Sequence, residues 1–241
     1  MASPGPNPRQ DVPHPHEVKL DPTGQFILVP DLGADLIRIF RIDSSTGTLT
    51  ACGDGQASPG DGPRHATWWQ PEGSSGTDGL VLYTLNELGN SVSSWDVSYG
   101  SECISLTLTD TLSTYDAGTT PGPTTKAAEI RVFDNFLYAS NRADETFGSE
   151  QDSIAIYTID AATGALSWLE AANAHAYYPR TFQINKEGTL VAIGGQTSSN
   201  VAIVSRDVAT GTLGELVASV QVGTPGRPGE EDGLSAVLWS E

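Results

Sequence analysis

The stretch Arg41-Ile-Asp-Ser-Ser-Thr-Gly-Thr-Leu49 decides the fold, because it returns twice further along the chain. The later copies are Thr158-Ile-Asp-Ala-Ala-Thr-Gly-Ala-Leu166 and Arg206-Asp-Val-Ala-Thr-Gly-Thr-Leu213. In each copy an alternating apolar run precedes the phrase, and its glycine supplies the positive φ that a tight hairpin needs. The phrase therefore predicts a β-hairpin that belongs to a longer internal repeat.

A second phrase precedes the hairpin and consists of two short apolar runs around a turn. Its four instances are Val18–Val29, Ala66–Tyr83, Ile130–Tyr138 and Thr181–Ala192. Aligned copies place His16, His65, Ala128 and Arg180 at equivalent positions, about 50 to 60 residues apart. Four strands in a repeat of this length are typical of a β-propeller blade, and an apolar period of two argues against a helical solenoid.

We therefore expect an all-β chain, a partial seven-bladed β-propeller with about four blades of four antiparallel strands and one extra strand. The expected blades are residues 14–61, 62–124, 125–176 and 177–223, with a final strand at 233–239. A Pro-rich segment, residues 1–13, precedes them and forms a poor strand. The orphan final strand indicates that about three N-terminal blades are absent, or that another chain closes the arc through open blade edges.

The charge balance restricts the partners. The chain has 12 basic and 30 acidic residues, a formal net charge of −18, so its surface repels nucleic acid and anionic membranes. No apolar run is long enough to cross a bilayer, and the sequence starts without a signal peptide. We expect a cytoplasmic protein, with secretion as the alternative. The acidic stretch Glu230–Asp232 is expected to be solvated.

The two cysteines, Cys52 and Cys103, have no metal-binding spacing. We expect them to be unpaired, with a disulfide as the alternative in an exported protein. No His, Cys or Asp group has zinc spacing, and no loop has a calcium-ligand pattern. Nucleotide-binding fingerprints are absent from the sequence as well, so neither a metal nor a cofactor is expected.

Ionisable residues gather where the first strand of each repeat begins and the second ends, which are positions at one mouth of a propeller channel. The starts hold His14-Pro-His16, Pro63-Arg64-His65, Ala128-Glu129 and Pro179-Arg180. The ends hold Pro30-Asp31, Asn86-Glu87, Asn141-Arg142 and Gly195-Gln196. Arginine forks suit a carboxylate or phosphate, and a histidine can exchange a proton near neutrality. The pattern predicts a small anionic substrate.

These positions provide the candidate site residues. The predicted catalytic set is His16, Arg64, Glu87 and Arg142. The predicted substrate-binding set is Asp31, His65, Glu129, Arg180 and Gln196. Three of them have structural alternatives: Arg180 as an ion pair with the next blade, Asp31 as a turn cap, and Glu129 as a loop anchor.

The quoted motifs resemble the lactonase family of seven-bladed propellers, which contains propeller-type 6-phosphogluconolactonase and fungal carboxy-cis,cis-muconate cyclase. The matching phrases are Pro13-His-Pro-His-Glu-Val18, Gly62-Pro-Arg-His65, Asn86-Glu-Leu88, Ser140-Asn-Arg142 and Pro179-Arg-Thr-Phe182. The resemblance implies an active site of one His, two Arg and one Glu, which falls on His16, Arg64, Arg142 and Glu87.

Three functions follow from this interpretation. Hydrolysis of a phosphosugar lactone leads, with the arginines binding the substrate and its oxyanion, His16 as general base and Glu87 orienting the imidazole or sharing the proton transfer. Cycloisomerisation of a carboxymuconate is the first alternative. A catalytically inactive propeller that serves as a binding module is the second, because fold alone does not fix function.

Overall fold

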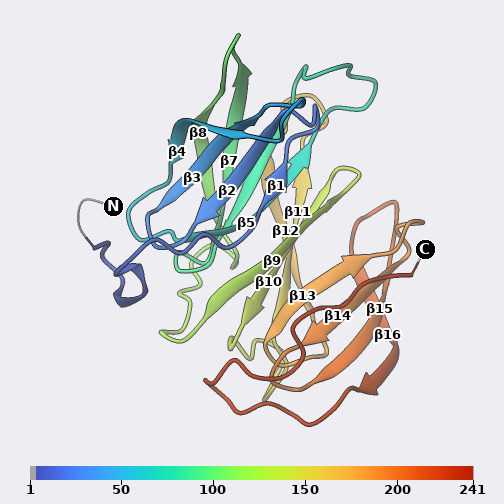
Figure 1. The fold of residues 1–241 in the computed structure, drawn as a ribbon. Helices are drawn as coiled ribbons and strands as arrows, with labels where there is room; N and C mark the ends of the chain where they lie inside the picture. Colours follow the sequence, from blue (N-terminus) through green and yellow to red (C-terminus); the bar gives the residue numbers. More distant parts are fainter. Residues whose placement is uncertain (1–3, 241) are drawn as a thin grey trace. The chain divides into compact units, whose positions relative to one another are not determined.

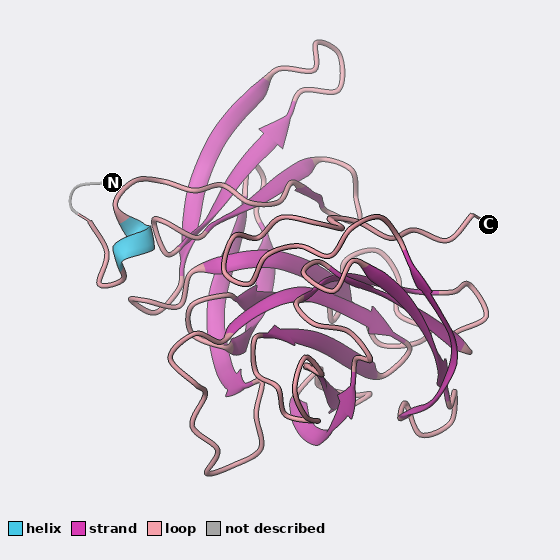
Figure 2. Ribbon diagram, turned by 90° about the horizontal axis from the view of Figure 1, so that it is seen from below, coloured by secondary structure: helices cyan, strands magenta, loops and turns pink. Residues whose placement is uncertain are grey.

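The computed structural model describes residues 4–240, and in this part of the chain strands dominate (Figure 2). A short 3-10 helix, η1 (Pro8–Gln10), comes first. The first sheet contains β1 (Lys19–Leu20), β2 (Phe26–Asp31), β3 (Leu36–Ile42) and β4 (Leu49–Gln56). The second contains β5 (Pro63–Trp69), β6 (Val81–Asn86), β7 (Ser91–Tyr99) and β8 (Ile104–Ser113).

The third and fourth sheets repeat this plan. The third contains β9 (Lys126–Phe133), β10 (Phe136–Arg142), β11 (Ser153–Ile159) and β12 (Leu166–Asn173). The fourth contains β13 (Pro179–Ile184), β14 (Leu190–Gly195), β15 (Asn200–Arg206) and β16 (Leu213–Gln221). Strands that follow one another in sequence are neighbours in every sheet (Figure 1). The predicted all-β architecture of four-stranded antiparallel blades is confirmed, and each expected blade range holds the strands of one sheet.

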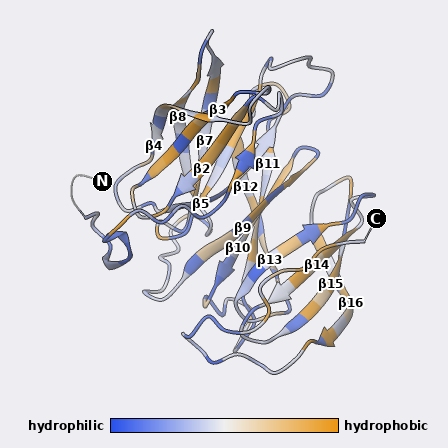
Figure 3. Ribbon diagram, viewed as in Figure 1, coloured by the Kyte–Doolittle hydropathy of each residue, from blue (hydrophilic) through white to orange (hydrophobic). Residues whose placement is uncertain are grey.

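The chain divides into two compact units, each with its own apolar core. The first unit runs to Ser113 and includes Asp160–Leu166, and the second comprises Thr114–Ile159 and the residues from Ser167 on. Hydrophobic residues are concentrated in the strands, and the loops are more hydrophilic (Figure 3). The core of the first unit is built from Phe26, Leu28, Ile37, Ile39, Ala57, Ala66, Leu82, Trp95 and Ile104. The core of the second is built from Tyr138, Ile154, Ile156, Ala172, Ala174, Ala176, Phe182, Val191, Ile193 and Val204.

The repeated phrase forms the predicted hairpin turn in all three copies. Its glycines, Gly47, Gly164 and Gly211, have φ values of 73°, 73° and 72°. The aspartate four residues earlier accepts the glycine amide through its backbone carbonyl, at 2.7 to 2.9 Å. The carboxylate of the same aspartate accepts backbone amides of the turn. These hydrogen bonds, together with those from Ser or Thr hydroxyls, hold the pKa of each aspartate below its usual value.

Two of these turns are also fastened by a tyrosine. The Tyr83 hydroxyl donates to the Gly164 carbonyl at 2.6 Å in the first unit. In the second unit the Tyr138 hydroxyl donates to the Gly211 carbonyl, also at 2.6 Å. Both tyrosines are buried on the second strand of their sheet, so one tertiary hydrogen bond recurs with the repeat.

Two expectations are corrected. The structure has no strand at residues 233–239, because a strand needs a hydrogen-bonded neighbour and this segment instead uses isolated contacts. The Leu234 amide donates to the Gln196 carbonyl at 3.2 Å, and the Trp239 indole donates to the Gln183 carbonyl at 2.9 Å.

The second correction concerns the cysteines, which were expected to be unpaired. Cys52 and Cys103 form a disulfide with a Cα–Cα distance of 5.8 Å. Cys52 lies on β4 and Cys103 directly precedes β8, on neighbouring sheets of the first unit. The bond joins residues 51 positions apart, so no local spacing motif announces it.

Among the described residues, no helix is long and apolar enough to cross a bilayer.

Candidate functional site

The start of the first strand and the end of the second lie side by side in every sheet, as the repeat alignment predicted. The paired residues are Pro15 with Asp31, Pro63 with Asn86, Ala127 with Asn141, and Pro179 with Gly195. Each sheet therefore presents its candidate residues at one end of its first two strands.

A one-residue β-bulge follows each of these pairs. Pro63 and His65 face the consecutive residues Asn86 and Leu85, so Arg64 is the surplus residue. Arg180 is the surplus residue of the fourth sheet in the same way. The third sheet has its irregularity at residues 128–129, and the first between residues 15 and 19. Bulges re-aim side chains, and here they do so at the candidate positions.

This register corrects the sequence alignment by one residue in the second sheet. We had matched His65 with Arg180. However, Arg64 directly follows the paired Pro63, just as Arg180 directly follows the paired Pro179, so Arg64 is the residue that matches Arg180. Both sheets have their bulge at the same position after the proline, so the matching dipeptides Pro63-Arg64 and Pro179-Arg180 carry the correct register in the sequence itself.

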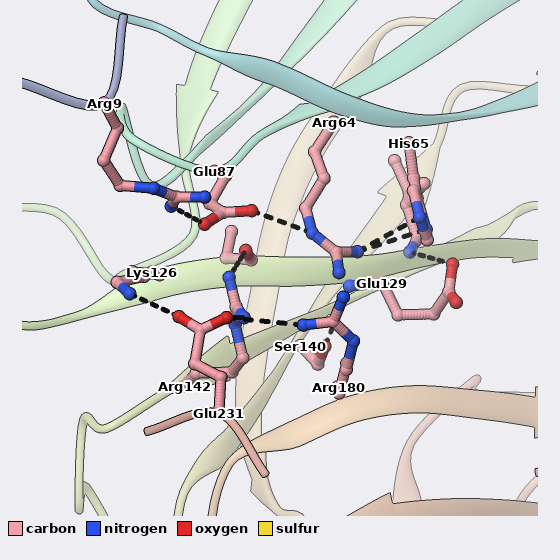
Figure 4. Close-up of polar contacts among 12 residues, drawn as sticks. Arg9, Arg64, His65, Glu87, Lys126, Glu129, Ser140, Arg142, Arg180 and Glu231 are labelled. Atoms are coloured by element: carbon pink, nitrogen blue, oxygen red, sulfur yellow. Dashed lines mark hydrogen bonds and ion pairs between the residues drawn. The ribbon is translucent and has the colours of Figure 1, made fainter. Parts of the chain in front are cut away.

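In the first unit, Arg64 and Glu87 form a buried ion pair. The Arg64 Nε atom lies 2.8 Å from Glu87 Oε2, and only 1% of Arg64 and 2% of Glu87 side-chain surface is exposed. Arg9, from helix η1, contacts the other carboxylate oxygen, so Glu87 lies between two arginines (Figure 4). A carboxylate held this way fixes the Arg64 guanidinium in place.

Two histidines extend this cluster. The Arg64 Nη1 atom lies 3.1 Å from His65 Nε2, and the ring centroids of His65 and His16 are 5.0 Å apart in an edge-to-face arrangement. Glu17, beside His16, accepts the Ala66 amide at 2.6 Å and so joins the two strand starts. The structure therefore brings together His16, Arg64, His65 and Glu87.

Asp31 has the contacts of a turn cap. Its fully buried carboxylate accepts the backbone amides of His14 and Ala34 and pairs with Arg38 at 2.8 Å. These partners favour the structural alternative for Asp31 over substrate binding.

In the second unit, Arg142 and Arg180 lie near one carboxylate, that of Glu231. Arg142 is fully buried, donates to the Ala127 carbonyl at 3.1 Å, and lies over the ring of Tyr178 at 5.1 Å. The Glu231 carboxylate lies 3.9 Å from Arg142 Nη1, 3.5 Å from Arg180 Nη1 and 2.6 Å from Lys126 Nζ (Figure 4). Glu231 is thus half-buried among cations. This corrects our expectation that its acidic stretch is solvated.

Glu129 and Gln196, both predicted to bind substrate, have internal partners. The Glu129 carboxylate pairs with Arg131 at 2.7 Å and accepts the Ile130 amide at 3.0 Å, which favours its structural alternative. The Gln196 side chain donates to the Glu231 carbonyl. Gln196 therefore anchors the segment that carries Glu231.

Asp152 supports the second unit's cluster through hydrogen bonds to the backbone around it. Its buried carboxylate accepts the amides of Ala143, Asp144, Glu145 and Tyr178. Burial raises the pKa of Asp152 to about 6. Asp152 fixes the loop after Arg142 and the backbone of the tyrosine that contacts that arginine.

Sequence reasoning missed four residues of these clusters, Arg9, Lys126, Asp152 and Glu231. The phrase Asn7-Pro-Arg-Gln10 does carry a signal, because Asn and Gln at this spacing form a capping box, and the structure contains it. Lys126 lies opposite Arg142 in the register of β9 and β10, so the repeat alignment could have identified it. Glu231 and Asp152 act through tertiary contacts that no local pattern reports.

The predicted site residues are divided between the two units. His16, Asp31, Arg64, His65 and Glu87 belong to the first, and Glu129, Arg142, Arg180 and Gln196 belong to the second. Between residues 4 and 240, no three His, Cys, Asp or Glu side chains gather in a group that could hold a metal ion.

A comparison with family models decides the classification. Residues 1–228 match the model described as lactonase, 7-bladed beta-propeller. The chain belongs to the seven-bladed β-propeller lactonase family. This membership confirms the resemblance inferred from the motifs.

This lactonase-family chain is similar to two curated proteins that have 6-phosphogluconolactonase in their names. It is 37% identical over 207 residues to a probable 6-phosphogluconolactonase of Arthroderma benhamiae, covering 85% of this chain and 50% of the relative. It is 28% identical to the 6-phosphogluconolactonase of Bacillus subtilis, covering 92% of this chain and 58% of the relative. The lactonase-family chain thus spans about half the length of these curated relatives.

Solved structures show the same likeness. The periplasmic gluconolactonase of Pseudomonas aeruginosa superimposes with a TM-score of 0.77 at 27% identity, over 92% of this chain and 58% of that one. A putative 6-phosphogluconolactonase of Bacteroides fragilis gives a TM-score of 0.75 at 26% identity, over 93% and 60%. Both cover this lactonase-family chain almost completely.

Proposed function

We propose that this protein hydrolyses a lactone, in the manner of a 6-phosphogluconolactonase, without a cofactor. The observation that carries the proposal is the buried Arg64–Glu87 pair with two histidines beside it. This arrangement combines a fixed cation with imidazole rings, a side-chain type that serves as a general base in catalysis. The names of the relatives support hydrolysis over the cycloisomerase alternative.

In the proposed reaction, His16 takes a proton from water as the water oxygen attacks the lactone carbonyl carbon. The carbonyl oxygen becomes an oxyanion, which the Arg64 guanidinium stabilises. When the ring C–O bond breaks, the imidazolium returns the proton to the leaving alkoxide, and a hydroxy acid results. The second histidine, His65, lies next to Arg64, and we propose that it connects Arg64 with the His16 imidazole.

The contacts of Glu87 change its proposed role. We had assigned it to orienting the imidazole or sharing the proton transfer, but its carboxylate contacts Arg64 and Arg9. We therefore propose that Glu87 is a positioning residue for Arg64. The catalytic role of Arg142, in the second unit, stays a prediction from the sequence.

The test compares two histidines that lie two positions apart. His16→Ala is expected to lower kcat for 6-phosphogluconolactone hydrolysis about 100-fold to 10,000-fold, the usual contribution of a general base. His14→Ala is the control, because the His14 side chain is 47% exposed and lies beside the exposed carboxylate of Asp11, at 3.2 Å. Its rate should equal that of the wild type, with and without chelator.

Two results would contradict the proposal. A His16→Ala variant with full activity excludes His16 as the base. A folded wild-type chain that hydrolyses no lactone favours the binding-module alternative.

The disulfide bears on localisation. Disulfides persist in oxidising compartments and are rare in the cytosol. The Cys52–Cys103 bond therefore favours the secreted alternative over the cytoplasmic one. Mass spectrometry of the native protein, alkylated before extraction, is expected to show two unmodified cysteines, whereas two alkylated ones would return the assignment to the cytoplasm.

A further inference from the structure

We infer that Lys126, Arg142 and Arg180 form a binding site for a phosphate or carboxylate group, and that Glu231 is an internal competitor for it. In this arrangement the Glu231 carboxylate occupies the place of the ligand's anion, and a ligand enters by displacing that side chain. The inference deepens the proposed function and rests on it in so far as Arg142 belongs to the predicted catalytic set.

Three strands contribute the cations of this anion site. Lys126 begins β9, Arg142 ends β10 opposite it, and Arg180 is the bulge residue of β13. All three belong to the second unit, so its own fold assembles them. A carboxylate is held by charge from three sides, with the Tyr178 hydroxyl as a further donor at 3.4 Å.

The balance of charge calls for an anion at this place. Arg142 is fully buried, and arginine does not lose its proton in proteins, so its charge must be compensated. Arg180 and Lys126 add two more positive charges, with 26% of each side chain exposed. The Glu231 carboxylate brings one negative charge to 2.6 Å from Lys126, 3.5 Å from Arg180 and 3.9 Å from Arg142. A phosphate, which carries more charge and more acceptor oxygens, compensates them better.

The way Glu231 is held makes it replaceable. Its distances to the two arginines, 3.5 and 3.9 Å, are longer than the 2.7–2.9 Å of a tight charge-assisted hydrogen bond. Its side chain is 30% exposed and belongs to a loop that follows β16. Vacating the anion site therefore requires a rotation of the Glu231 side chain that breaks these two long contacts and the tighter one with Lys126, at 2.6 Å.

The backbone of that loop has its own attachments. The Gly226 amide donates to the Thr197 carbonyl at 2.7 Å, and the Leu234 amide donates to the Gln196 carbonyl at 3.2 Å. Gln196 in turn donates to the Glu231 carbonyl. The loop thus keeps Glu231 at a high local concentration beside the cations, as a competitive internal ligand requires.

Neighbouring acidic residues provide a matched control. Glu230 is exposed and pairs with Arg227 at 3.9 Å, and Asp232 pairs with the same arginine at 2.9 Å. Glu230→Gln therefore removes the same charge as Glu231→Gln, one residue away, without touching the three cations.

The experiment measures binding by isothermal titration calorimetry with inorganic phosphate, and with D-gluconate as the carboxylate probe, on the full chain. If Glu231 occupies the site about nine-tenths of the time, Glu231→Gln should tighten the phosphate Kd about tenfold, because an internal competitor weakens apparent affinity by the fraction of sites left open. Glu230→Gln should leave Kd at the wild-type value. Adding Arg180→Ala to Glu231→Gln should remove the gain.

Equal Kd values for Glu231→Gln and the wild type would overturn the inference, as would equal gains in Glu231→Gln and Glu230→Gln. Tightening for gluconate alone would identify a carboxylate site, and tightening for phosphate alone a phosphate site. If Glu231→Gln fails to fold, Arg180→Ala in the wild-type chain replaces it, and unchanged phosphate binding by that variant refutes the site. Because no turnover is measured, a chain that binds phosphate as expected but hydrolyses no lactone would refute only the proposed function.

Discussion

Asp152 makes the stability of the second unit depend on pH. Its buried carboxyl has a pKa raised from 3.8 to about 6, so the folded chain retains a proton that the unfolded chain releases. The free energy of unfolding should therefore fall as pH rises from about 4 to about 6, by up to about 3 kcal/mol from this group. Urea unfolding at intervals across that window measures the fall. Asp152→Asn, which cannot titrate, should lack this component, and an unchanged pH profile in that variant would contradict the assignment.

Also at the residue scale, the sequence predicts the contacts of a charged side chain when the position of that residue in the repeat determines its surroundings. Arg64 and Glu87 come from the register of two adjacent strands, and they do meet. Arg9 and Glu231 come from segments outside the sheets, and their contacts depend on the path that each segment takes over the folded sheets. Periodicity carries no information about such crossings.

Among the structural elements, the repeated hairpin turn allows a matched comparison. Gly47 and Gly164 both have φ of 73°, but a Cβ atom at Gly164 would lie 2.7 Å from Val81 and 2.9 Å from Trp69, whereas one at Gly47 meets nothing within 4 Å. Gly47→Ala should cost roughly 1–2 kcal/mol for the left-handed backbone alone. Gly164→Ala should cost about 1–3 kcal/mol more, from overpacking. Urea midpoints measure both, and equal losses would show that the packing at Gly164 yields freely.

The strands themselves were predictable because each repeat copy reinforces the interpretation of the others. The segment 233–239 has the same apolar pattern as a first strand, yet the structure assigns it none. Pattern reports which residues suit a strand, whereas hydrogen-bonded pairing decides whether one forms.

For the molecule as a whole, the disulfide is the strongest single covalent constraint among the described residues. It closes a loop of 51 positions in the first unit, for which the loss of chain entropy on cross-linking corresponds to about 4 kcal/mol. The Cys52→Ser, Cys103→Ser double variant should therefore melt at a lower temperature than the oxidised wild type. Calorimetric scans with and without reductant provide the measurement and its control, because reductant should destabilise the wild type and leave the variant unaffected. Identical melting in all four scans would argue against the bond.

The bulge beside the first strand of each sheet has a consequence for the evolution of such a protein. Hydrogen-bond pairing resumes on both sides of the surplus residue, so the ladder does not depend on that residue's side chain. Arginine occupies it in two sheets, and the third sheet has Ala128 and Glu129 there. The bulge thus separates the hydrogen-bonded framework from the side chains at one end of each sheet, so single side chains at these positions can be exchanged while the framework is retained.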